Sequence, residues 1–107
     1  MSSSIPPVGL VERISECLLL ADPRDRDELA AVAGMLGELV AWAQPGDARV
    51  FEATKNAHNR LATGLVDDAL DLAPIVEIVA RYLSALQQII ANGGHAEWVS
   101  FPSELGV

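Results

Sequence analysis

Apolar residues recur at helical spacing along most of this chain, and the clearest recurrence lies in residues 74–91. Hydrophobic residues there follow the i, i+3, i+4, i+7 pattern, which places them on one face of an α-helix. Pro74 suits a first turn because its missing N–H would have no partner there. Asn92 and Gly93 suit the end because both adopt the left-handed conformation readily. Other helices must cover the apolar face, which consists of Ile75, Ile78, Val79, Tyr82, Leu83, Leu86, Ile89 and Ile90.

The same spacing predicts three earlier helices, over residues 7–21, 23–43 and 48–72. Asp22 is expected to be the N-cap of the second helix and Asp47 the N-cap of the third, because a carboxylate at that position accepts a backbone N–H. Gly64 could split the third helix in two. Short connections favour helices that run up and down as neighbours. We therefore predict an all-α protein, an antiparallel four-helix bundle.

The length of 107 residues indicates a single domain over the whole sequence. Residues 1–6 are predicted to be a flexible N-terminal tail, and residues 95–107 a C-terminal tail. Trp98, Val99 and Phe101 in the second tail are expected to fold back onto the end of the bundle. On the second helix, small residues form a stripe that predicts a close crossing with another helix, since the distance between helix axes depends on the side chains at the contact. The stripe consists of Ala30, Gly34, Gly37 and Ala41.

The charge balance restricts the class of partner. Seven Lys and Arg residues stand against fifteen Asp and Glu residues, which gives a net charge of -8. Nucleic acid and anionic membranes are therefore not expected as partners, because affinity for phosphate comes largely from Lys and Arg. The first residues lack the pattern of a signal peptide, and no run of about 18 apolar residues occurs. These absences predict a cytoplasmic location.

His58 suggests a specific chemistry, because histidine phosphotransfer proteins of bacterial signalling relays carry an exposed histidine on a helical bundle. Lys55, Asn56 and Arg60 lie nearby and could steady a phosphoryl group. The stretch 49–60 is also the one locally cationic part of the sequence. Phosphotransfer domains, however, usually place Lys and Gly three and four residues after the histidine, where this chain has Leu61 and Ala62. Phosphotransfer through His58 is therefore an alternative hypothesis.

No metal site and no cofactor are predicted. Histidine and cysteine residues show none of the spacings typical of metal ligands. Asp67, Asp68 and Asp71 form a compact acidic group, which we interpret as a solvated face or as capping of the next helix. A hydrolase or ligand-binding bundle using this group with a divalent cation is a third hypothesis. Cys17, the one cysteine, is expected on the core face of the first helix, buried and inert.

The hydrophobic content favours a non-enzymatic function. Half of the residues are hydrophobic, and several apolar side chains fall outside the inward face of their helices. Large apolar patches are uncommon on monomers and usually mark contact sites. The leading hypothesis is a small protein–protein interaction module that forms a homodimer, with the first two helices as the favoured interface. The candidate interface residues are Leu19, Leu20, Met35, Trp42, Trp98 and Phe101.

Overall fold

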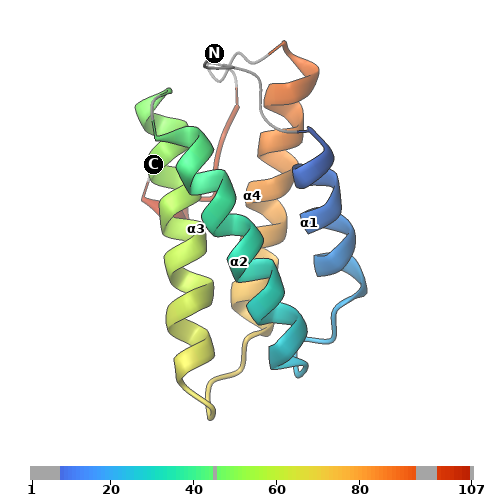
Figure 1. Ribbon diagram of the computed structural model, residues 1–107. Helices are drawn as coiled ribbons and strands as arrows, with labels where there is room; N and C mark the ends of the chain where they lie inside the picture. Colours follow the sequence, from blue (N-terminus) through green and yellow to red (C-terminus); the bar gives the residue numbers. More distant parts are fainter. Residues whose placement is uncertain (1–7, 45, 94–98, 107) are drawn as a thin grey trace.

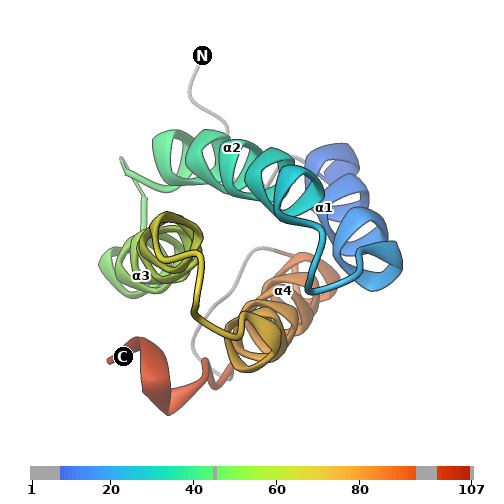
Figure 2. The same ribbon diagram turned by 90° about the horizontal axis from the view of Figure 1, so that it is seen from below.

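The computed structural model describes residues 8–44, 46–93 and 99–106, and these residues form helices without any strand. The helices are α1 (Val8–Leu20), α2 (Arg26–Ala43), α3 (Ala48–Val66) and α4 (Ala73–Ala91), followed by a short 3-10 helix, η1 (Ser103–Leu105). Seen from the end, the four long helices form a ring in which each packs against two neighbours (Figure 2). The chain reverses direction from each helix to the next (Figure 1). The predicted all-α fold with four helices is confirmed.

The fourth helix matches its prediction closely. α4 begins one residue before Pro74 and ends at Ala91. Gly93 follows with a φ of 73°, the left-handed conformation expected of a helix stop. Seven side chains of α4 are buried, more than on any other helix. They form one stripe that faces the interior of the ring: Ile78, Val79, Tyr82, Leu83, Ala85, Leu86 and Ile89.

The second helix starts later than predicted. Its N-cap is Asp25, whose carboxylate accepts the N–H of Glu28 at 3.2 Å. Asp22, the expected cap, accepts the N–H of Arg24 instead, within a turn that precedes the helix. Both aspartates can satisfy a free backbone N–H, and tertiary packing selects the one at which the helix begins. Asp47 is the N-cap of α3 as predicted, accepting from Arg49 and Val50.

The third helix is neither split at Gly64 nor extended to Leu72, so both of those expectations were wrong. α3 continues through Gly64 and ends at Val66. A β-carbon at Gly64 would lie 2.7 Å from Cδ1 of Ile75 and 2.8 Å from Cδ2 of Leu72. Gly64 therefore allows the chain that leads into α4 to pack closely against α3. Its role is this contact and not an interruption of the helix.

Arg26 fastens the end of α3 to the start of α2. Its guanidinium donates to the carbonyls of Asp67 at 2.9 Å and Leu70 at 3.0 Å, and at longer range to those of Leu65 (3.3 Å) and Gly64 (3.5 Å). The last carbonyls of a helix have no partner within the helix, and they form the negative end of its dipole. The guanidinium of Arg26 gives these carbonyls hydrogen-bond donors and also places a positive charge at the negative end of the helix dipole. It also orders the turn that leads from α3 to α4.

One polar pair lies inside the core. The hydroxyl of Thr54 donates to the carbonyl of Val50 at 2.7 Å, so it accepts the hydroxyl of Tyr82, also at 2.7 Å. Both side chains are fully buried. Burial raises the pKa of the Tyr82 phenol far above its usual value, and the hydrogen bond with Thr54 offsets this rise only in part. The pair links α3 to α4 at the middle of the bundle.

We expect Arg26→Ala to lower the free energy of unfolding by about 1–3 kcal/mol, the cost of leaving the carbonyls at the end of α3 without a charged donor. Urea denaturation of both proteins measures the difference. Arg24→Ala is the matched control, because Arg24 is exposed and its hydrogen bond to Asp22 comes from the backbone. The control should change stability by less than about 0.5 kcal/mol. Equal effects of the two substitutions would contradict the role of Arg26.

Alkaline pH should destabilise the protein through Tyr82. In the unfolded chain this phenol loses its proton near pH 10, whereas the folded protein retains the proton to higher pH. The stabilisation is therefore complete below about pH 10 and decreases as the pH rises above it. Because the chain has one tyrosine, near-ultraviolet tyrosinate absorbance reports this residue directly. The absorbance should appear together with the loss of helical circular dichroism, and titration in the folded state would contradict the assignment.

Candidate functional site

A groove of about 470 Å³ lies between α1 and α4. Small side chains create it. Ala73, Ala80 and Ser84 line it on the side of α4, and Ser15 and Ala21 line it on the side of α1. The two helices therefore leave space between them that larger side chains would fill. The remaining residues that line the groove are Leu18, Leu19, Val76, Glu77, Leu83 and Gln87.

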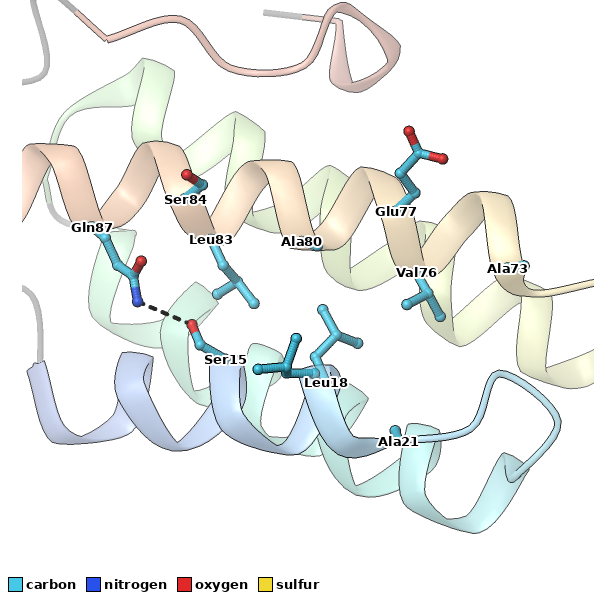
Figure 3. Close-up of a pocket in the computed structure, with 11 residues that line it drawn as sticks. Ser15, Leu18, Ala21, Ala73, Val76, Glu77, Ala80, Leu83, Ser84 and Gln87 are labelled. Atoms are coloured by element: carbon cyan, nitrogen blue, oxygen red, sulfur yellow. Dashed lines mark hydrogen bonds between the residues drawn. The ribbon is translucent and has the colours of Figure 1, made fainter.

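The groove has an apolar floor and one polar end. Leu18 points from α1 toward α4, and Val76 and Leu83 point from α4 toward α1 (Figure 3). At the polar end, the side-chain amide of Gln87 donates to the hydroxyl of Ser15 at 3.2 Å. Glu77 is the one charged residue of the lining, and its carboxylate points away from α1 (Figure 3). Such a surface is suited to contact with another apolar surface.

The two leucines that end α1 are the most exposed large hydrophobic side chains of this region. Leu19 is 85% exposed and borders the groove, and Leu20 is 83% exposed. Val66 at the end of α3 is exposed as well. In Figure 1, α1 and α3 end on the same side of the bundle. Apolar side chains thus remain uncovered at that end of the molecule, next to the opening of the groove.

The other candidate interface residues lie elsewhere. Met35 and Trp42 of α2 are half-buried and pack against the core. Phe101 is 6% exposed, because it is covered within its own chain. Trp98 lies outside the described residues. The α2 half of the predicted interface would therefore have to use side chains that already pack against the core, whereas the groove between α1 and α4 is open.

The C-terminal residues fold back as expected, but along the side of the bundle and not at its end. Val99, Phe101 and Leu105 are buried against α3 and α4. Asn56 in the middle of α3 donates to the carbonyl of Leu105 at 2.6 Å. Arg81 in the middle of α4 pairs with Glu104 at 2.6 Å. Residues 99–106 are thus a packed part of the fold.

His58 is half-buried at the contact between α2 and α3, whereas an exposed position is typical of phosphotransfer histidines. A β-carbon at Gly37 would lie 3.6 Å from Nε2 of His58. Gly37 is the member of the small-residue stripe of α2 that contacts a neighbour, and that neighbour is the imidazole of His58. The other members, Ala30, Gly34 and Ala41, are exposed, so the stripe as a whole does not form the predicted close crossing. The cations near His58 are engaged with other groups, since Arg60 donates to Glu104 and Lys55 pairs with Glu52. Phosphotransfer through His58 stays a prediction that this packing does not support.

The acidic group does not assemble into a site. Asp67, Asp68 and Asp71 are exposed in the turn after α3. Asp67 accepts the N–H of Ala69, and Asp71 accepts the N–H of Ala73 at the start of α4. Within the described ranges, no three His, Cys, Asp or Glu side chains are placed to hold a metal ion. These carboxylates order the turn.

Cys17 is exposed, so its predicted burial was wrong. α1 packs against α2 and α4 through a narrow strip of side chains, Val11, Ile14 and Leu18. Cys17 lies beside that strip and faces solvent. The helical pattern identified the apolar half of α1, but it did not show how little of that half its neighbours would cover.

Sequence reasoning also missed the α4 side of the groove. Ala73, Ala80 and Ser84 were not predicted as site residues, because small residues on the outer face of a helix are common. A signal was present, since positions 73, 77, 80, 84 and 87 repeat at helical spacing along a second face of α4. This face becomes a site only because α1 lies beside it.

No protein-family model matches this chain, and no curated protein or solved structure is significantly similar to it. Among the described helices, none combines the length and the apolar character needed to cross a membrane. The functional argument therefore depends on the geometry of the chain itself.

The contact between Gly37 and His58 gives a stability prediction. Replacing either Gly34 or Gly37 with Leu raises helix propensity by a similar amount, about 0.8–1 kcal/mol. A β-carbon at Gly34 would meet nothing within 4 Å, whereas one at Gly37 would already be in van der Waals contact with His58, so the further atoms of a leucine there overlap the imidazole. Gly37→Leu should therefore be less stable than Gly34→Leu by about 1–3 kcal/mol, the usual cost of overpacking. Urea midpoints measure this difference, and equal midpoints would refute the close contact.

Proposed function

We propose that this protein is a non-enzymatic interaction module that forms a homodimer through the groove between α1 and α4. The observation that carries the proposal is the scarcity of charge on this face. The chain has a net charge of -8, yet Glu77 is the one charged residue among those lining the groove. Two copies that approach through the groove bring only one carboxylate each, that of Glu77, to the residues that line it. The cores of protein interfaces are depleted of charged residues in the same way.

The face is also complementary to itself. It carries a projecting apolar side chain, Leu19, beside a groove with small residues such as Ala80. In a two-fold dimer the same patch is used on both subunits. Leu19 of one copy can therefore enter the groove of the other, and the reverse contact forms by symmetry. An apolar surface of this kind supports a protein partner over nucleic acid.

The energetics require more than this one leucine. Burying a leucine side chain contributes about 1.5–3 kcal/mol, and two-fold symmetry doubles that contribution. Association costs at least about 4 kcal/mol in lost translational and rotational freedom. The dimer must therefore also cover apolar surface that is still exposed, such as the half-buried Val76 in the groove and the exposed Leu20 at the end of α1. An occupant that fills the groove achieves this, and a contact through Leu19 alone does not.

We expect the wild-type protein at micromolar concentration to have about twice the monomer mass of 11.4 kDa. Leu19→Glu and Ala80→Glu should both lower the mass to that of the monomer, because each places a charge at the contact. Gel filtration coupled to light scattering measures the mass. Circular dichroism confirms that the variants stay helical.

Ala30→Glu provides the matched control. Ala30 is exposed on α2, so the same substitution adds the same charge away from the groove. The control should keep the mass of the dimer. A wild-type mass of 11.4 kDa would reject the homodimer. A dimer that survives Ala80→Glu would reject this interface while keeping the dimer.

A further inference from the structure

The side of α4 that lies away from α1 is partly covered by C-terminal residues of the same chain. The segment 99–106 lies outside the ring of helices, against α3 and α4 (Figure 2). Its buried side chains are Val99, Phe101, Pro102 and Leu105, and those of Ser100, Ser103 and Glu104 are exposed. The ring of Phe101 stacks on that of Tyr82 with 6.0 Å between centroids. The segment thus uses a few apolar anchors, in the manner of a bound peptide.

Polar side chains of α3 hold the main chain of this segment. Arg49 donates to the carbonyl of Val99, Asn56 to that of Leu105 and Arg60 to that of Glu104. The donors are separated by seven and four positions, so they share one face of the helix. Backbone carbonyls are present in every peptide. This face can therefore bind an extended segment through its main chain, and the apolar anchors provide the selectivity.

The surface continues past the segment that occupies it. A cleft of about 600 Å³ begins at Leu105 and Gly106 and follows α3 toward the turn before α4. Leu70 and Ile75 provide apolar surface in this cleft, and Asn59, Thr63 and Asp67 provide polar groups. A ligand peptide that lies in this cleft would have these groups as its lining. The carboxylate of Asp67 would favour a basic side chain there.

We propose that the α3–α4 face is a peptide-binding site whose ligand is an extended segment of a partner protein. The ligand carries an apolar residue, an aromatic residue followed by proline, and a leucine, at the spacing of Val99, Phe101, Pro102 and Leu105. A basic residue follows and reaches Asp67. Residues 99–106 occupy the site within the chain, and the partner segment displaces them because it also fills the open cleft. This site is separate from the groove between α1 and α4.

The test uses a fluorescent peptide with the sequence of residues 99–106 followed by Ser-Lys-Lys. The receptor is the full chain carrying Phe101→Ala, which weakens the internal segment without changing α3. When the internal segment occupies the site in most molecules, the apparent affinity for an added peptide is reduced by the fraction of molecules whose site is open. Fluorescence anisotropy should therefore show at least about tenfold tighter binding to Phe101→Ala than to the wild type. Adding Asn56→Ala to the receptor should weaken the binding again.

Two controls make the result decisive. A peptide with alanine in place of its phenylalanine and leucine should not bind, and a peptide without the two lysines should bind more weakly.

If Phe101→Ala loses its helical circular dichroism, Glu104→Ala replaces it as the receptor, since this variant removes the exposed pair with Arg81 and leaves the anchors in place. Equal binding to the wild type and to the weakened receptor, or no binding to either, would overturn the proposal.

Discussion

The apolar surface of α4 is too wide for any single neighbour to cover, and the rest of the structure follows from this constraint. α4 has the largest number of buried side chains, and it contacts α1 on one side and α3 on the other. Uncovered apolar surface of this extent costs free energy in proportion to its area. The chain covers α4 from three directions, with two helices and with residues 99–106.

The two sides are covered in different ways, and the candidate sites arise from this difference. α1 meets α4 with few large side chains, and small residues such as Ala21 and Ala80 leave a groove. On the other side, α3 is the more polar helix. Its Arg49 and Asn56 bind the backbone of the C-terminal segment while Phe101 covers Tyr82. The first surface is apolar and open, whereas the second is closed by a segment of the chain held through its carbonyls.

Helix ends in this bundle depend on contacts between elements as much as on local signals. Arg26 belongs to the first turn of α2, where the dipole of its own helix disfavours a cation. Its guanidinium instead reaches the end of α3, where the dipole favours one. Gly64 acts similarly, since its missing side chain matters because of Leu72 and Ile75 and not because of α3 itself. Both residues connect parts of the chain that are distant in sequence.

The amino-acid sequence by itself determined that the protein is helical, where most helices lie and which face of each is apolar. These properties depend on spacing within one helix, so Pro74, Asp47 and the stripe of α4 could be interpreted directly. Only the tertiary structure decided the half-buried position of His58, the exposure of Cys17, the end of α3 and the existence of the groove. Each of these depends on which side chain of another helix lies opposite, and helical periodicity contains no information about that partner. The same reason explains why Leu19 could be predicted as an exposed side chain from its own helix, while Ala80 could not be predicted as part of a site.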